Sequence, residues 1–413
     1  MNTQKKVVLA FSGGLDTSFC VPYLIENGFK VITLFVHTGS ISDQEIQRIA
    51  QRAQEVGADE HVAVDAGQDI WDSVVTPMIM GGVKYQDQYP LLCSDRYVIA
   101  AESVKLAHER GAHAIAHGCT AMGNDQVRFD QTIHTLSELP ILAPIRDIMA
   151  HTKTPRLFEM NELAKRGIKV SQEAKQYTIN ENLLGTTLSG SEIDEMGSPG
   201  SGTYKLTKPA AHWPRAPLRV AIGFDRGRVV TLDGKAVDGP RLLSTLNTKF
   251  GAYGVGRGIY TGDTIVGLKG RIVFECPGLE VLLVAHKAIE ELVLTKSQNG
   301  FKPVAARKWT ELVFGGMFYE PLRADLELFI RSSQQTVTGE VVIESSGGVC
   351  LPVEVHTQNA LIRSSASYAQ YADWSPKEAE GFIKIHGQSS STGALTRART
   401  AANSEDQACC VAY

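Results

Sequence analysis

A short Gly-Gly segment between an apolar run and a helical pattern is the feature that most restricts the fold of this chain. Residues Val7 to Phe11 predict a buried strand, residues 12–18 read Ser-Gly-Gly-Leu-Asp-Thr-Ser, and the apolar spacing that follows predicts a helix. Adjacent glycines let the backbone approach an anion closely, while hydroxyls and the free N–H groups of a first helical turn supply donors. The sequence therefore predicts a phosphate-binding strand, loop and helix; an ordinary Gly-rich turn is the structural alternative.

The phosphate loop differs from the Walker pattern G-x-x-x-x-G-K-[ST]. It is shorter and no lysine follows its glycines, so a kinase-like grip on a γ-phosphate is not expected. Its residues resemble the S-G-G-x-D-[ST]-S loop of the PP-loop ATP pyrophosphatases. That resemblance implies a loop that holds the β- and γ-phosphates of ATP while a nucleophile attacks the α-phosphorus.

Strands and helices alternate through the first part of the chain. Further strands are predicted at residues 31–36, 61–64 and 112–116, and helices at 42–56 and 95–110. Such alternation is typical of the α/β class, with a mostly parallel, doubly wound sheet and ligands beyond the carboxyl ends of its strands.

The pattern changes from about Ala174 to short strands mixed with helices. Strands are predicted at 219–224 and 229–235, where Asp233-Gly234 is a hairpin signal, and helices at 239–253, 278–295, 307–314 and 322–334. A last helix follows Ser375-Pro376, and we expect the Ser-, Thr- and Ala-rich tail from Gly387 to be disordered unless a partner subunit holds it. We therefore expect an ATP-binding domain (1–170), an α+β substrate domain (171–373) and a C-terminal helix with its tail (374–413).

Composition argues against two classes of partner. The formal net charge is −4 over 413 residues and no Lys/Arg block occurs, so no nucleic acid is expected. No run approaches the roughly 18 apolar residues that span a bilayer, so no membrane is expected. The seven cysteines are scattered without C-x-x-C spacing, which fits small apolar residues in a cytoplasmic protein.

Three more segments narrow the ATP pyrophosphatase class: residues 117–130, residues 177–187, and the stretch from 253–257 to 274–278. With the phosphate loop, in this order and spacing, they closely resemble the argininosuccinate synthase family from about residue 6 to 386. The resemblance implies an adenine nucleotide alpha hydrolase-like first domain. It also implies ligation of L-citrulline and L-aspartate to argininosuccinate, with ATP carrying Mg²⁺ and leaving as AMP and pyrophosphate, in a homotetramer whose C-terminal segment reaches a neighbour.

The resemblance also implies a set of site residues, with Ser12, Asp16 and Asp125 as catalytic residues and no metal site of the chain's own. ATP would be bordered by Ala10, Phe11, Ser12, Gly13, Gly14, Leu15, Asp16, Thr17, Ser18, Val36 and Gly118. Aspartate would be held by Thr120, Asn124 and Asp125, and citrulline by Tyr89, Ser94, Asn124, Arg128, Thr178 and Thr187. The side-chain chemistry agrees, because hydroxyls and an amide can orient a neutral ureido group, Arg128 suits a carboxylate and Asp125 suits an ammonium. Asp16 organises either the loop or its metal.

Some of these residues have structural alternatives. Thr178 and Asn180 before Glu181 also fit a helix cap, and we interpret His37 and His117 as residues that shape strand ends.

Several positions depart from the family pattern. The usual C-T-G-K-G-N-D has Ala121 and Met122 in place of its first glycine and its lysine, and alanine would be strained if that glycine had a positive φ. The usual A-N-I-G-Q reads Val-His-Thr-Gly-Ser at 36–40. These changes place the chain on a divergent branch.

Two further departures affect citrulline directly. A citrulline-binding Glu and Tyr are missing at Gly262 and Phe274, and we expect Asp263 to take over part of the carboxylate's role. A paralogous adenylating ligase that joins aspartate to a different ureido or amide compound is therefore the alternative function.

Overall fold

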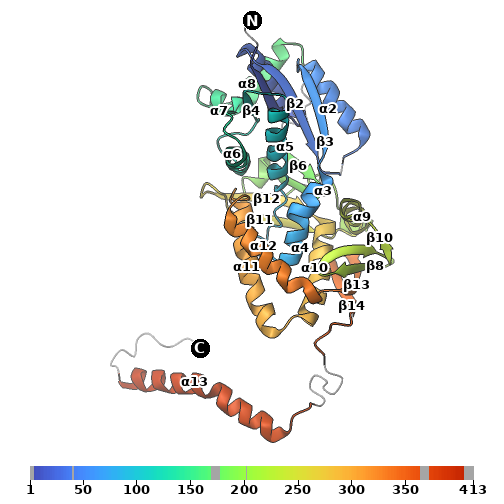
Figure 1. The fold of residues 1–413 in the computed structure, drawn as a ribbon, viewed down its shortest axis with the longest axis vertical. Coiled ribbons are helices and arrows are strands. Elements are labelled where there is room, and N and C mark those ends of the chain that lie inside the picture. Colours follow the sequence, from blue (N-terminus) through green and yellow to red (C-terminus); the bar gives the residue numbers. More distant parts are fainter. Residues whose placement is uncertain (1–3, 40, 169–176, 201, 363–371, 404–413) are drawn as a thin grey trace. The chain divides into compact units, whose positions relative to one another are not determined.

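The computed structural model describes residues 4–39, 41–168, 177–200, 202–362 and 372–403. The chain divides into two compact units, residues 1–360 and residues 361–413, and each is described by itself. Figure 1 labels many of their elements.

A five-stranded parallel sheet forms the N-terminal part of the first unit, in the order β3-β2-β1-β4-β5. Its strands are β1 (Lys6–Ala10), β2 (Lys30–His37), β3 (Glu60–Asp65), β4 (Ala114–Ala116) and β5 (Ile141–Leu142). The predicted α/β class and the parallel sheet are thereby confirmed. Because β1 lies between β2 and β4, the segment after β1 emerges at the middle of the sheet's carboxyl edge.

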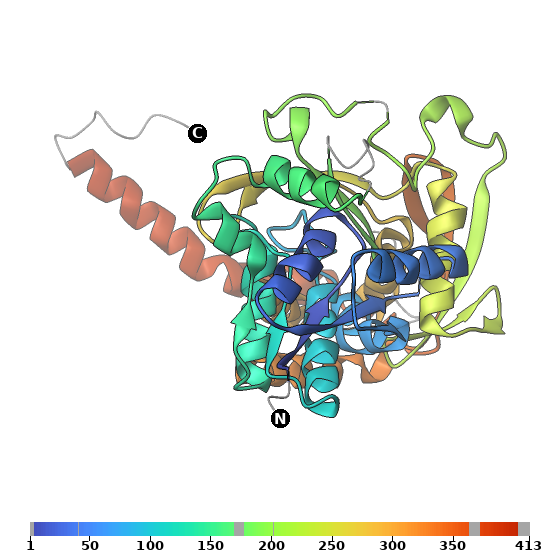
Figure 2. The same ribbon diagram turned by 90° about the horizontal axis from the view of Figure 1, so that it is seen from above.

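Helices cover both faces of this sheet (Figure 2). The chain supplies α1 (Leu15–Glu26), α2 (Asp43–Glu55), α3 (Gly67–Ile70), a π-helical segment η1 (Trp71–Val75), α4 (Thr76–Gly81), α5 (Asp95–Glu109), α6 (Asn124–Leu136), α7 (Pro144–Met149) and α8 (Pro155–Lys165). Each face of the sheet has its own hydrophobic core, and alternate residues of β1 point into one or the other. Val7 and Leu9 pack with residues of α1, α2, α7 and α8, whereas Val8 and Ala10 pack with residues of α5 and α6. This alternation explains why a continuous apolar run makes a strand that is buried on both faces.

Two antiparallel sheets follow within the same unit. One has the order β11-β12-β7-β6 and the other β10-β9-β8-β13-β14. Their strands are β6 (Thr178–Asn182), β7 (Gly185–Ser189), β8 (Leu218–Asp225), β9 (Arg228–Leu232), β10 (Lys235–Ala236), β11 (Arg257–Asp263), β12 (Lys269–Glu275), β13 (Gly339–Gly347) and β14 (Val349–His356). Thr178 and Asn180 belong to strand β6, so the helix-cap alternative for them is wrong.

Helices between these strands complete the α+β part. They are α9 (Gly239–Gly251), α10 (Pro277–Val293), α11 (Lys296–Phe314) and α12 (Pro321–Ser333), with short 3₁₀ turns η3 (Ser191–Ile193), η4 (Ala210–His212) and η5 (Gln334–Thr336). Helix α11 begins earlier than the predicted residue 307, because Thr295 and Gln298 form a capping box at its start.

The second unit contains one long helix, α13 (Pro376–Asn403). Ser375 and Glu378 form its N-terminal capping box, as their reciprocal hydrogen bonds show. The helix continues past Gly387, where the sequence suggested a disordered tail. Threonine hydroxyls bond the carbonyls four residues earlier along it, so these polar residues fit within the helix. Residues 404–413 of the expected tail lie outside the described residues.

Among the residues that the structure describes, no helix is both long and apolar enough to cross a bilayer.

Candidate active site

The predicted phosphate loop connects the end of β1 to the first turn of α1. Gly13 has a φ of +73°, a conformation that favours glycine, and Gly14 occupies the cap position of α1. The N–H group of Gly14 donates to Ser12 Oγ at 3.4 Å, and that oxygen lies 3.3 Å from Thr17 Oγ1. Since the glycine cap offers no side-chain acceptor, the N–H groups of the first turn of α1 can turn to an incoming anion.

A cation that sequence reasoning missed supports the base of this loop. The Nε atom of Arg52, in the last turn of α2, donates to Ser18 Oγ at 3.0 Å, and Ser18 Oγ in turn donates to the Gly13 carbonyl at 3.4 Å. The Arg52 side chain is mostly buried and also pairs with Glu55 at 3.6 Å. The only signal in the sequence was an arginine near the end of the helix predicted for residues 42–56.

The strands on either side of β1 bring the other predicted ATP-binding residues to the same edge. Val36 lies near the end of β2, and Gly118 lies two residues after the end of β4. A Cβ atom at Gly118 would lie 3.1 Å from Thr17 Cγ2, so the absence of a side chain lets this segment rest against the phosphate loop. The remaining buried members of the predicted ATP set are Ala10, Phe11 and Leu15.

His117 shapes the turn that leaves β4. Its Nε2 atom lies 2.7 Å from Asp130 Oδ1, and its Nδ1 atom accepts a hydrogen bond from the Cys119 N–H at 3.2 Å. Arg146 also donates to Asp130, at 2.7 Å. An Nδ1 atom that accepts requires the proton on Nε2. These contacts agree with a residue that holds the turn rather than with a nucleophile.

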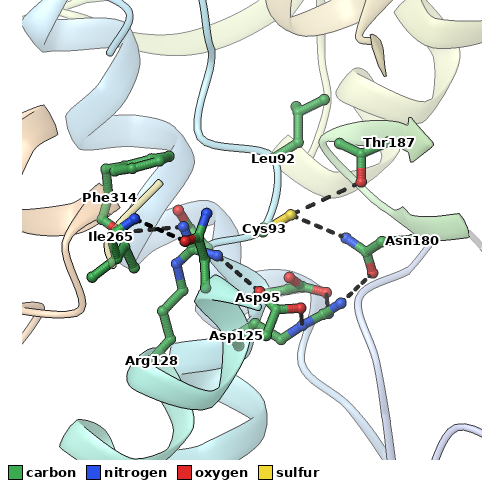
Figure 3. A network of polar contacts seen from close by, with 12 residues as sticks. Leu92, Cys93, Asp95, Asp125, Arg128, Asn180, Thr187, Ile265 and Phe314 are labelled. Atoms are coloured by element: carbon green, nitrogen blue, oxygen red, sulfur yellow. Dashed lines mark hydrogen bonds and ion pairs between the residues drawn. The ribbon is translucent and has the colours of Figure 1, made fainter. Parts of the chain in front are cut away.

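A network of ion pairs follows this turn (Figure 3). Asp125, in the first turn of α6, accepts from Arg128 Nη1 at 2.8 Å and from Arg96 Nε at 2.9 Å. Arg96, from the first turn of α5, also donates to Asp95 at 2.7 Å and to Asn180 Oδ1 of β6 at 2.8 Å. A single guanidinium therefore joins the N-terminal domain to the antiparallel sheet.

The two arginines set the charge state of the network. Burial would raise the pKa of Asp125, but the charges of Arg96 and Arg128 outweigh it and hold that pKa below its ordinary value. At Asp95 burial dominates and raises the pKa, although Arg96 opposes the shift. Two cations thus face two carboxylates, Asp125 with a lowered pKa and Asp95 with a raised one. Guanidinium groups such as these are suited to a substrate carboxylate.

Arg128 and Asn124 tie the network to later parts of the chain. Arg128 is almost fully buried, donates to the Phe314 carbonyl at 3.1 Å, and its guanidinium carbon lies 5.3 Å from the centroid of the Phe314 ring. Asn124 Oδ1 accepts from the Ile265 N–H at 2.8 Å. Thr120 is partly exposed, just before the start of α6.

The thiol of Cys93 lies among several residues predicted to bind citrulline. The Tyr89 hydroxyl donates to its sulfur at 3.2 Å, and Thr187 Oγ1 and Asn180 Nδ2 each lie 3.9 Å away (Figure 3). Sequence reasoning missed Cys93, Arg96 and Asn180. The available signal was their position, because Cys93 and Arg96 flank Ser94 and Asn180 lies two residues after Thr178.

Two predicted citrulline residues do not reach this network. Ser94 is buried and donates to the Leu91 carbonyl at 2.8 Å. Thr178 is exposed at the beginning of β6, whereas Asn180 on the same strand contacts Arg96.

Asp263 lies at the end of β11, paired with neighbours rather than alone. Its carboxylate accepts from Gln86 at 3.0 Å and from Lys269, and the hydrogen bond from Lys269 lowers its pKa. Gln86 also accepts from the Tyr260 hydroxyl at 2.9 Å. A Cβ atom at Gly262 would lie 2.5 Å from that hydroxyl, so the missing side chain makes room for this contact.

The Asp263→Asn enzyme is expected to need about tenfold more citrulline, since it loses the charge that would attract the substrate ammonium. The KM for ATP should stay unchanged. Steady-state kinetics with each substrate varied in turn measures both values. Asp225→Asn, at the end of β8, changes another exposed carboxylate that pairs with a cation, here Arg226, and serves as the control. Ordinary citrulline kinetics in the Asp263→Asn enzyme would leave Asp263 as a surface turn residue.

The departures at Phe274, Ala121 and Met122 fit their surroundings. Phe274 is buried, with its ring centroid 5.8 Å from that of Tyr89, and a Cβ atom at the facing Gly258 would lie 2.1 Å from the Phe274 ring. Ala121 is not among the described residues with positive φ, so the expected backbone cost does not arise. Met122 is 63% exposed, where the family's lysine would also meet solvent.

Comparison with known proteins places this arrangement in one family. Residues 6–167 match the arginosuccinate synthase N-terminal HUP domain, and residues 177–392 match the arginosuccinate synthase C-terminal domain. An argininosuccinate synthase of Xanthomonas campestris pv. campestris is 53% identical over 94% of this chain and 98% of its own length, and that of Xylella fastidiosa is 53% identical over 94% and 97%. The argininosuccinate synthase of Methanocaldococcus jannaschii is 36% identical over 93% and 96%. With its phosphate loop and both domains matched, the chain belongs to the argininosuccinate synthase family.

Proposed function

We propose that this enzyme ligates L-citrulline and L-aspartate to argininosuccinate, a step of arginine biosynthesis, and releases AMP and pyrophosphate from ATP. Membership of the family supports this activity, as do relatives that are 53% identical over nearly their whole length and bear that name. The structural observation that carries the proposal is the meeting of the phosphate loop with the segment after β4. Gly118 lies against Thr17, and the same segment continues into Asp125 and its two arginines.

The first step is adenylation of citrulline. Direct attack of an amine on a urea carbon would have to expel oxide or hydroxide, so the ureido oxygen first needs a better leaving group. In the proposal this oxygen attacks the α-phosphorus in line, and pyrophosphate departs into the phosphate loop. Donors from Ser12, Thr17 and the first turn of α1 stabilise the charge that develops there.

The second step is displacement of AMP by aspartate. The α-amine of aspartate attacks the ureido carbon of citrullyl-AMP, and the C–O bond to AMP breaks. We assign the placement of aspartate to Thr120, Asn124 and Asp125, and that of citrulline to the residues around Cys93 and Arg128. No covalent bond to the enzyme forms, so catalysis rests on position and charge.

In this mechanism Mg²⁺ reaches the active site bound to ATP. The described part of the chain contains no group of three His, Cys, Asp or Glu side chains that could hold an ion by itself. Mg²⁺ commonly binds through substrate phosphates with few protein ligands, and the ion supplies neutralisation of phosphate charge.

The alternative substrate is not favoured. The changes at Gly262 and Phe274 suggested a different ureido or amide substrate. At Gly262, however, the side chains of Gln86 and Tyr260 occupy the space of the missing side chain. The ring of Phe274 packs against that of Tyr89. The 53% identical relatives named for argininosuccinate also argue against it.

We further propose a cytoplasmic homotetramer. The five described cysteines are all free, which agrees with a reducing compartment. Helix α13 exposes Phe382, Ile383 and Ile385, each by more than 60%, which agrees with an arm that packs on a neighbouring subunit.

Product analysis tests the proposed reaction. With citrulline, aspartate and Mg·ATP, we expect AMP and pyrophosphate in equal amounts, because the loop is of the pyrophosphate-binding kind. Chromatography of the nucleotides distinguishes AMP from ADP. ADP and phosphate as the main products would refute the proposal.

A further inference from the structure

A buried glutamate that the proposed mechanism does not use lies beneath the phosphate loop. Glu159 is fully buried on α8, where this helix packs against α1 and the Phe158 ring meets the Phe19 ring at a centroid distance of 6.0 Å. Carboxylates are almost never buried without a partner, because the loss of hydration costs several kcal/mol. Its burial therefore calls for a physical explanation.

Among the described residues, the charged group that acts most strongly on Glu159 is another acid, Asp16. Neither of its oxygens accepts a hydrogen bond from a described donor. The side chain that it meets is that of Asp16, in the first turn of α1 within the phosphate loop. Two ionised carboxylates only repel each other, so a hydrogen bond between them requires a shared proton.

Burial identifies the residue that holds the proton. Asp16 is partly exposed on the loop side, whereas both oxygens of Glu159 are sealed from solvent. Burial of Glu159, followed by the charge of Asp16, raises the pKa of the glutamate to about 9, and Arg156 on the same helix opposes the shift. Cys20 of α1 and Asp147 of α7 also face this cluster, and burial raises the pKa of the Cys20 thiol.

We propose that Glu159 is a positioning residue for ATP: it stays protonated and donates a hydrogen bond to the Asp16 carboxylate, which it fixes within the phosphate loop. The pair then carries one negative charge instead of two beneath the site where phosphates bind. A fixed Asp16 also holds the first turn of α1, whose N–H groups face the anion. This role deepens the proposed function and rests on it for its effect on activity.

Two substitutions distinguish the ability of residue 159 to donate a hydrogen bond from its ability to ionise. Glu159→Gln keeps a donor to Asp16 but cannot ionise, and Glu159→Leu keeps the volume but removes the donor. At neutral pH we expect citrulline-dependent ATP–pyrophosphate exchange to stay within about threefold of wild type in the Gln enzyme. We expect it to fall about 10-fold or more in the Leu enzyme, the value of one charge-assisted hydrogen bond.

The pH dependence of exchange distinguishes a protonated Glu159 from a side chain that only fills space. Wild-type exchange should fall as the pH rises through about 9, since Glu159 then loses its proton and repels Asp16. The Gln enzyme should lack this fall. Glu162→Gln is the matched control, because it removes a partly exposed carboxylate of the same helix that pairs with Lys165 and Arg166, and it should leave the profile unchanged.

The pair should also affect stability in a known direction. A raised pKa in the folded state stabilises the protein below the ordinary value of 4.5 and withdraws that stability as the pH rises towards about 9. The melting temperature of wild type should therefore fall relative to that of Glu159→Gln across this interval. Circular dichroism measures it without any substrate.

Infrared spectroscopy observes the proton itself. The difference spectrum of wild type minus Glu159→Gln at neutral pH should contain a carboxylic acid C=O band, and Glu162→Gln should lack that difference. This result is independent of activity, so an inactive enzyme with the band would refute the proposed function alone. Absence of the band, or a Gln enzyme with the wild-type alkaline fall, would overturn the role of Glu159.

Discussion

The Asp16→Ala and Ser12→Ala enzymes are each expected to lose about 10²-fold or more of citrulline-dependent ATP–pyrophosphate exchange. Ser12 Oγ accepts from the Gly14 N–H and contacts Thr17, so its loss loosens the loop that receives pyrophosphate. Asp16 lies in the first turn of α1, and its loss leaves the buried Glu159 without its partner. Exchange of labelled pyrophosphate into ATP, measured without aspartate, isolates this half-reaction.

A matched control tests whether the loss of any carboxylate from the first turn of a helix lowers exchange. Asp43→Ala changes an exposed acid at the same place in the next helix, the first turn of α2, and should leave exchange unaltered. If Asp16→Ala and Ser12→Ala both exchanged at the wild-type rate, neither residue would belong to the ATP site.

Asp125→Ala is expected to abolish argininosuccinate formation and to lower the free energy of unfolding by about 3 kcal/mol. The substitution leaves Arg96 and Arg128, both mostly buried, without their shared carboxylate. We place the cost at the low end for buried ion pairs because a third of the Asp125 side chain is exposed. Denaturant unfolding and a coupled assay of argininosuccinate measure the two effects.

The same substitution should also weaken the exchange half-reaction. Sequence comparison alone would confine Asp125 to the aspartate step, but the structure shows that it holds Arg128, which is assigned to citrulline. Asp125→Asn, which keeps the shape but not the charge, should give an intermediate loss in both half-reactions. Wild-type exchange in Asp125→Ala would show that the two substrates are held independently.

The phosphate loop and the parallel sheet could be predicted because their signals are local. A continuous apolar run followed by Ser-Gly-Gly specifies a buried strand and an anion loop within a dozen residues, and the helix predicted for residues 42–56 is strongly amphipathic. The α/β class and the family were confirmed, and phosphate binding by the loop stays a prediction.

Side-chain partners could not be predicted because they come from distant segments. Arg96 contacts Asp125 and Asn180, and Glu159 contacts Asp16. These residues lie far apart in the sequence, and hydrophobic periodicity gives no information about such contacts. The extent of α13 was also missed, since its Ser, Thr and Ala composition resembles a tail and its hydroxyls find backbone acceptors only once the helix exists. Local chemistry specifies the loop, and tertiary contacts specify its partners.

Citrulline-dependent ATP–pyrophosphate exchange in the absence of aspartate is the decisive measurement of whether this enzyme adenylates citrulline. Labelled pyrophosphate should enter ATP rapidly with citrulline and not at all without it. Added aspartate should divert the intermediate to argininosuccinate and AMP. Exchange that is independent of citrulline, or that requires a different ureido or amide compound, would contradict ligation of citrulline by this enzyme.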